Sequence, residues 1–160
     1  MNKVHWTSMG TILALLLLAS GCLPEARARI EVTKLVKIAV PPESACMSEP
    51  QVWGAGNNPK YCVGHAVTCI VGSSLTREKI QEYYTQRLGA GWTRFDVDQS
   101  GAIQWFNQGD LLDRMIVISY EPKYLPVDSQ AGRELQGARQ TRTSAYELTV
   151  VANKCTGPFP

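Results

Sequence analysis

The sequence lacks an apolar run long enough to cross a bilayer. A membrane-spanning helix needs about 20 mostly apolar residues, whereas the longest run, residues 9–19, supplies about eleven. No run after Cys22 could take its place. We therefore expect no membrane-spanning helix in this chain.

Motifs of nucleophilic, cofactor and metal chemistry are also missing. There is no Gly-x-Ser-x-Gly elbow, no Cys-x-x-Cys, and Gly54-Ala55-Gly56 lacks the third glycine of a dinucleotide loop. His65 is the only histidine after the N-terminal segment. On a strand it would lie about 13 Å from Cys69, too far for a local dyad. We interpret His65 as a hydrogen-bonded strand residue and expect no cofactor.

An excess of charge of one sign is missing too. The chain has 16 basic and 14 acidic residues, whereas nucleic-acid-binding domains carry a clear basic footprint. Nucleic acid is therefore not an expected partner.

The N-terminal segment has the three-part layout of a secretory signal peptide. Lys3 precedes the apolar run, and small residues follow it. These end in Ala19-Ser20-Gly21-Cys22, which resembles the lipobox of bacterial lipoproteins. The resemblance implies that residues 1–21 are removed, that the Cys22 sulfur is linked to diacylglycerol, and that the new amino group is acylated. An ordinary signal peptide cut near Gly21 and an uncleaved signal anchor are the alternatives.

The lipoprotein resemblance also implies a location. Leu23 follows the cysteine, at the position where an Asp would resemble the signal that retains enterobacterial lipoproteins in the inner membrane. The resemblance therefore implies that a Gram-negative cell would place the protein in the outer membrane, on the periplasmic side of the cell envelope. Two or three acyl chains are needed for stable anchoring, since each buried CH₂ contributes about 0.8 kcal/mol. Residues 22–33 would form a tether, in which Arg27 and Arg29 either contact anionic headgroups or are simply solvated.

The remaining four cysteines indicate an oxidising compartment. Cys46, Cys62, Cys69 and Cys155 are an even number in a chain that carries an export signal, so we expect two disulfides. Four cysteines allow three connectivities, which the sequence does not distinguish. Our preferred pairing joins Cys46 to Cys62 and Cys69 to Cys155.

The mature chain has the length of one domain, residues 34–160. Alternating patterns predict strands over 34–40, 63–71, 92–97, 102–106, 111–120 and 146–152, the second of them central and the next three a meander. Residues 41–61 have loop composition. Residues 77–88 have helical spacing, with Thr76 as N-cap and Gly89 at the end. We expect Tyr83 and Tyr84 of this helix to pack against the sheet.

These elements define an α+β class, with one main helix packed on an antiparallel sheet of about five or six strands and two disulfides. The stretch YYTQRLGAGWTRF resembles a layout found in several small periplasmic proteins of unknown role. That resemblance implies the fold and carries no functional residues.

Two weak candidate sites remain. Asp96, Asp98 and Ser100, followed by Gly101, resemble the opening of an EF-hand calcium loop, although position twelve is Asn107 and the flanks are strands. A hairpin turn explains the same residues. Trp53 and Tyr61 could form a stacking surface for a glycan, or pack their loop onto the domain.

The polar segment 126–144 is predicted to be a long loop. Its arginines are a candidate site for a protein partner, with disorder as the alternative: Arg133, Arg139 and Arg142.

Two classes of function follow. The first is a lipid-anchored envelope subunit that binds or assembles with an envelope protein without catalysis, which we favour because no catalytic constellation is visible. The second is an envelope-acting hydrolase or glycan-binding protein, whose acidic residues, such as Asp96 or Asp113, would meet only in the folded chain.

Overall fold

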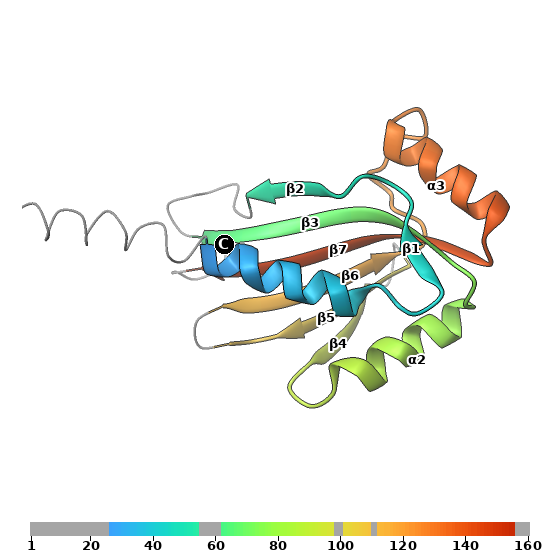
Figure 1. Cartoon of the computed structure of the whole chain (residues 1–160). Coiled ribbons are helices and arrows are strands. Elements are labelled where there is room, and N and C mark those ends of the chain that lie inside the picture. Colours follow the sequence, from blue (N-terminus) through green and yellow to red (C-terminus); the bar gives the residue numbers. More distant parts are fainter. Residues whose placement is uncertain (1–25, 55–61, 98–100, 110–111, 156–160) are drawn as a thin grey trace, which may run out of the picture.

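The fold was determined as a computed structural model, which describes residues 26–54, 62–97, 101–109 and 112–155. The described chain forms one antiparallel sheet of seven strands and three helices (Figure 1). The α+β class is confirmed. The expectations of one main helix and of five or six strands are corrected to three helices and seven strands.

The sheet has the order β1-β3-β7-β6-β5-β4, with β2 also paired to β3. The bounds of its strands are β1 Ser44–Cys46, β2 Gln51–Gly54, β3 Cys62–Ser73, β4 Thr93–Val97, β5 Ala102–Asn107, β6 Asp113–Ser119 and β7 Ser144–Cys155. All pairs are antiparallel. The predicted meander is confirmed as β4, β5 and β6.

The centre of the sheet is the pair β3 and β7. These twelve-residue strands are in register along their whole length, from Ser73 opposite Ser144 to Cys62 opposite Cys155. Residues 69–73 of β3 are buried, and burial on both faces of a strand requires the apolar or small side chains that this stretch supplies. The prediction of a central strand here is confirmed.

The segment predicted to be a loop over 41–61 contains two short strands instead. Strand β1 pairs with the last part of β3, and β2 pairs with an earlier part, so the two lie end to end along one edge. Neither has enough residues for a visible alternating pattern. Their strand conformation comes from the ladder that β3 offers.

The predicted strand over 34–40 is wrong, because residues 26–39 form a helix, here called the N-terminal helix. Its buried side chains recur at helical spacing: Ala28, Val32, Leu35 and Ala39. The window 34–40 alone is too short to distinguish this period from alternation. The helix therefore includes residues 26–33, which the sequence had suggested as tether.

The helix predicted over 77–88 is confirmed as α2, Arg77–Leu88. The Thr76 hydroxyl accepts a hydrogen bond from the Lys79 amide, and Gly89 ends the helix at φ 66°. Tyr84 is fully buried, with its ring 4.7 Å from the ring of Trp105 on β5. The predicted packing of this tyrosine on the sheet is confirmed.

The predicted polar loop over 126–144 is corrected to a third helix, α3, Gln130–Thr141. The Ser129 hydroxyl caps it by accepting from the Gly132 amide at 3.0 Å. Leu135 and Ala138 bury its narrow apolar side against Ile70 and Ala145. The sequence pattern does not predict this helix, because its buried side has few apolar residues and the helix contains glycine.

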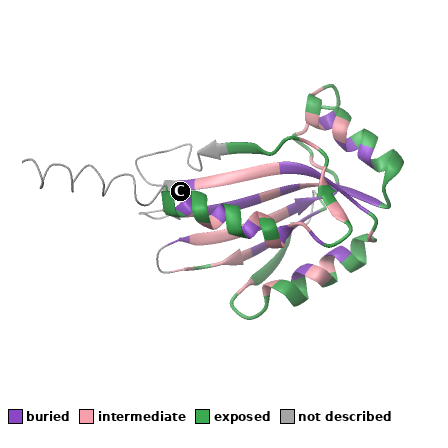
Figure 2. Ribbon diagram, viewed as in Figure 1, coloured by how far each residue is buried: buried purple, intermediate pink, exposed green. Residues whose placement is uncertain are grey.

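The helices cover the two sheet faces unequally. The N-terminal helix and α2 pack on the face that carries Cys69, Val71 and Tyr146. Helix α3 packs on the opposite face, at the Ser73–Ser144 end (Figure 1). No other described helix covers that face, whose remaining strand residues are mostly half-buried (Figure 2).

Candidate functional site

A cavity of about 330 Å³ lies where α3 meets the open sheet face. The connection between β1 and β2 forms one wall, α3 and the segment before it form the other, and β3 and β7 form the floor. The residues that line it include no lysine, arginine or histidine. Its polar side chains are carboxylates, hydroxyls and amides, among them Ser48, Glu49, Thr68, Ser129, Glu134 and Glu147.

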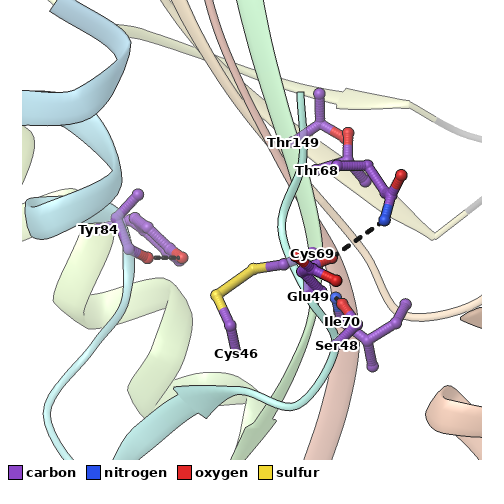
Figure 3. The surroundings of a disulfide bond; sticks show 10 residues. Cys46, Ser48, Glu49, Thr68, Cys69, Ile70, Tyr84 and Thr149 are labelled. Atoms are coloured by element: carbon purple, nitrogen blue, oxygen red, sulfur yellow. Dashed lines mark hydrogen bonds between the residues drawn. A yellow bond between two sulfur atoms is a disulfide. The ribbon is translucent and has the colours of Figure 1, made fainter. Parts of the chain in front are cut away.

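The wall formed by the β1–β2 connection is tied to β3 by a disulfide and two hydrogen bonds. Cys46 is bonded to Cys69 with a Cα–Cα distance of 5.8 Å. The Met47 amide donates to the Ile70 carbonyl at 2.6 Å, and the Ile70 amide donates to the Ser48 hydroxyl at 2.8 Å. Figure 3 shows Ser48 and Glu49 beside β3 next to this disulfide. The β1–β2 connection is therefore fixed to β3 at the point where it lines the cavity.

The Cys46–Cys69 bond corrects the preferred pairing of Cys46 with Cys62 and of Cys69 with Cys155. Cys46 lies opposite Val71 in the β1–β3 pair, and Cys69 is two residues along β3 on the same face. Because the sequence predicts a loop over 41–61, it does not indicate that Cys46 and Cys69 lie close together. Among the cysteines whose side chains the structure describes, Cys46 and Cys69, this is the disulfide.

Glu147 is a carboxyl group of the cavity whose pKa is perturbed. It is half-buried on β7, and burial raises its pKa above the usual value of 4.5. A second cavity of about 240 Å³, lined by Ser119, Lys123 and Tyr124 among others, lies on its other side. Glu147 and Leu125 line both cavities. The carboxyl group is thus positioned between two hollows of the same face.

Sequence reasoning did not single out Glu147. Alternation along β7 places Tyr146 and Leu148 toward the core and Glu147 on the opposite face. This alternation was the available signal for the position of Glu147. It does not indicate a site, because acidic residues are common on the solvent-facing side of a strand. Helix α3, a segment that the sequence predicts as a loop, and residues 122–126 before it surround that position.

A second threonine hydroxyl lies next to the one that lines the cavity. The Thr68 and Thr149 hydroxyls lie 3.0 Å apart across the β3–β7 pair. Together with the carboxylates, they offer mainly hydrogen-bond acceptors and exchangeable hydroxyl donors. The cavity can therefore accept a ligand group that is cationic or rich in hydroxyl groups.

The three arginines predicted as a partner site lie on or at the end of α3 without converging. Arg133 donates to the Asp128 carbonyl and Arg139 to the Tyr120 carbonyl. Arg142 caps the helix, its amide donating to the Ala138 carbonyl at 2.9 Å. Two of the three guanidinium groups therefore bind backbone of their own chain. Their contact with a partner stays a prediction.

The residues predicted for calcium and for glycan are only partly within the described chain. Asp96 lies on β4 and accepts a hydrogen bond from Arg94 at 2.9 Å, whereas Asp98 and Ser100 lie outside the described residues. Trp53 lies on β2 opposite Ala66, and Tyr61 is outside the described part. Within that part, no group of three acidic, histidine or cysteine side chains could hold a metal ion.

The acidic residues suggested for a hydrolase do not meet. Asp96 on β4 lies opposite Ile103 on β5, which in turn lies opposite Ile118 on β6. Strand β6 begins at Asp113. The stretch of extended chain from Ile118 back to Asp113 spans roughly 16 Å. These two carboxylates cannot act as a pair on one substrate bond.

His65 lies on β3, as predicted, but its Nδ1 atom is buried without a hydrogen-bond partner among the described residues. The expectation of a hydrogen-bonded histidine is therefore not met at this nitrogen. Cys69, four residues further along β3, is engaged in the disulfide. A dyad of these two residues is excluded.

The described helices of the chain are all too short or too polar to cross a membrane. Cys22 lies outside the described residues. Comparisons with protein-family models, with curated proteins and with solved structures find no match to this chain.

Proposed function

We propose that this protein is a lipid-anchored lipoprotein of the bacterial cell envelope that binds a partner or ligand without catalysis. The anchoring part of the proposal is supported by the lipobox-like Ala19-Ser20-Gly21-Cys22. The binding part depends on one observation, the cavity between α3 and the sheet, which offers acceptors and hydroxyls without a nucleophile–base pair. In a Gram-negative cell, its location would be the periplasmic side of the outer membrane.

The N-terminal helix supports a short connection to the membrane. Its described part starts at residue 26, and the first buried residue of that part is Ala28. Four residues beyond Cys22 can span at most about 14 Å when fully extended. A lipid on Cys22 would therefore hold the folded domain close to the bilayer surface.

The cavity suggests the chemistry of the bound group. Three carboxylates and several hydroxyls line it, with no basic side chain to neutralise them. A protonated amine or a sugar hydroxyl cluster can donate hydrogen bonds to such a lining. We therefore propose an envelope protein that presents a basic side chain to this cavity, with glycan as the second possibility.

The test is in-cell cross-linking and affinity capture followed by mass spectrometry. The bait should carry diacylglycerol on Cys22 and capture a discrete envelope protein, and Cys22→Ala should lose the lipid and the capture. Glu147→Gln should weaken the capture while leaving the lipid in place. Glu82→Gln, an exposed carboxylate on α2, is the matched control that should leave both unchanged. A lipidated bait that captures no protein contradicts the subunit proposal.

We also propose a second disulfide, between Cys62 and Cys155. These residues are directly opposite each other at the end of the β3–β7 pair. Opposite Cα atoms in antiparallel strands are about 4.5–5.5 Å apart, within the usual range for disulfides. Two residues further along, Gly64 lies opposite Asn153, and the strands are close there too. A Cβ on Gly64 would collide with the Cβ of Asn153.

Formation of this bond removes two thiol protons and two electrons, which an envelope disulfide oxidant would accept. Peptide mapping of the native protein without reduction should show a peptide of Cys62 linked to one of Cys155. Alkylation of both cysteines before reduction would contradict the second bond. The Cys46–Cys69 peptide in the same digest is the internal control.

A hydrolase is the second candidate function, favoured by the raised pKa of Glu147 in a cavity that also contains Glu49 and Glu134. Carboxyl groups with perturbed pKa values are frequent in active sites. Purified protein incubated with peptidoglycan fragments would release new products, and Glu147→Gln would stop their release. Unchanged fragments after prolonged incubation would leave the binding function as the better proposal.

A further inference from the structure

The outward side of the N-terminal helix is strongly basic. Its exposed cationic residues are Arg27, Arg29, Lys34 and Lys37. The single carboxylate within residues 26–39 is that of Glu31, which is half-buried. It accepts from Arg114 on β6 at 2.7 Å and lies 3.8 Å from the Lys34 ammonium group. Its charge is thus largely engaged within the chain, and the outward side stays positive.

A cavity of about 540 Å³ opens beside this basic side. The helix lines it with Arg27, Ile30, Glu31 and Lys34, and Arg114 and Leu112 line it from the sheet side. Arg114 is fixed there, because it also donates to the Asn107 amide oxygen at 3.0 Å. Three cationic side chains, those of Arg27, Lys34 and Arg114, therefore surround a hollow that contains one carboxylate, which leaves a positively charged site that can form charge-assisted hydrogen bonds with a phosphate group.

An apolar side chain accompanies these charges. Ile30 is 56% exposed on the outward side, between the cationic residues. Cationic side chains that flank an exposed apolar residue are typical of helices that lie in the headgroup region of a membrane. The opposite side of the helix packs on the sheet through Val32 and Leu35, so only this side is available to another surface.

We propose that this basic side and its cavity bind the phosphate headgroups of anionic phospholipids in the membrane that holds the anchor. The inference rests on the proposed lipidation of Cys22. At most about 14 Å of chain separates Cys22 from the helix, and charges interact over roughly 8–10 Å at physiological salt. An anchored domain thus reaches the headgroup layer with this helix first.

The experiment uses the full lipidated protein reconstituted in two kinds of vesicle. One contains phosphatidylcholine alone, and the other contains about one third phosphatidylglycerol. Short pulses of acetic anhydride followed by mass spectrometry report the labelling rate of each lysine. We expect Lys34 and Lys37 to label roughly five-fold more slowly on the anionic vesicles, since about 1 kcal/mol is typical for each basic residue near such a surface. High salt should restore their rates.

Internal and variant controls separate this effect from general shielding. Lys79 on α2 and Lys123 before α3 are exposed elsewhere and should label equally on both vesicles. The double variant Arg27→Gln/Arg29→Gln should lose much of the protection at Lys34 and Lys37. The matched variant Lys79→Gln/Arg87→Gln removes two charges from α2 and should keep it. Equal labelling of Lys34 and Lys37 on the two vesicles overturns the inference.

The mass of the N-terminal peptide distinguishes failure of the anchor from failure of the basic side. If this peptide carries no lipid, the anchoring proposal fails, and vesicle flotation then tests the helix directly. Flotation with anionic but not with neutral vesicles supports headgroup binding. Absence from both overturns it.

Discussion

The side-chain hydroxyl of Tyr84 on α2 donates a hydrogen bond to the carbonyl of Ala39, at the end of the N-terminal helix. The adjacent Tyr83 does the same to the Ile38 carbonyl at 2.7 Å. The last carbonyls of a helix have no partner within it. The two neighbouring tyrosines therefore supply hydrogen-bond donors to carbonyls at the end of the N-terminal helix. These bonds join the two helices on the same sheet face.

Tyr84→Phe leaves the Ala39 carbonyl without its donor in a buried position. An unsatisfied buried acceptor typically costs about 2 kcal/mol of stability, and we expect a loss of that order. Tyr83→Phe is the matched variant and should cost less, since Tyr83 is only half-buried and water can replace its hydroxyl. Urea denaturation followed by circular dichroism measures both. Equal losses for the two variants would contradict the role of burial.

Loss of the Cys46–Cys69 bond should lower the free energy of unfolding by about 3 kcal/mol. The bond closes a loop between residues with a sequence separation of 23, and without it the unfolded chain gains conformational entropy. The variant Cys46→Ser/Cys69→Ser tests this by urea denaturation without reductant. In the presence of reductant, the wild type and the variant should unfold at similar urea concentrations. A difference that persists under reduction would indicate lost packing instead.

Leu135→Ala should cost about 3 kcal/mol, since it removes the largest buried side chain of α3 from a small cluster. Hydrogen exchange should become faster in residues 130–141 before the rest of the chain is affected. Gln136→Ala, the next position and exposed, should change stability by no more than about 0.5 kcal/mol. Slow exchange of α3 in Leu135→Ala would show that other contacts hold the helix.

Glu147→Gln should make the protein more stable than the wild type at neutral pH. Burial raises the pKa of Glu147 in the folded state, so the unfolded chain releases this proton at lower pH. The carboxyl group therefore costs stability as pH rises from the usual pKa of 4.5 through its raised pKa. The difference in thermal midpoint between variant and wild type should grow from pH 4 to pH 7. A difference that stays constant over this range would contradict the shift.

The sequence predicted the elements whose signals are local. Helix α2 has its cap, its spacing and its terminal glycine within one short stretch, and the meander strands alternate between turn residues. Helix α3 has a cap at Ser129 but buries little, so its conformation depends on Ile70 and Ala145 from β3 and β7. Strands β1 and β2 likewise depend on β3.

The candidate site could not be predicted for the same reason. Glu147 is notable because α3 and the segment before it enclose cavities beside it, and Ser48 lines the cavity because β1 pairs with β3 and forms the Cys46–Cys69 bond. These relationships join different elements of the fold, and the connections between those elements are irregular in length and composition. No local pattern contains them.

The position of β7 has a consequence for how the chain folds. It is the last described strand along the chain, yet it lies between β3 and β6 in the sheet. Until β7 is available, β1–β3 and β4–β6 are two separate pieces, each with an unpaired central edge that could pair with other chains. Productive folding must therefore wait for the C-terminal strand, and contacts of such long sequence separation form slowly. A chain that is cut before residue 144, or still entering its compartment, would need a chaperone that shields these two edges.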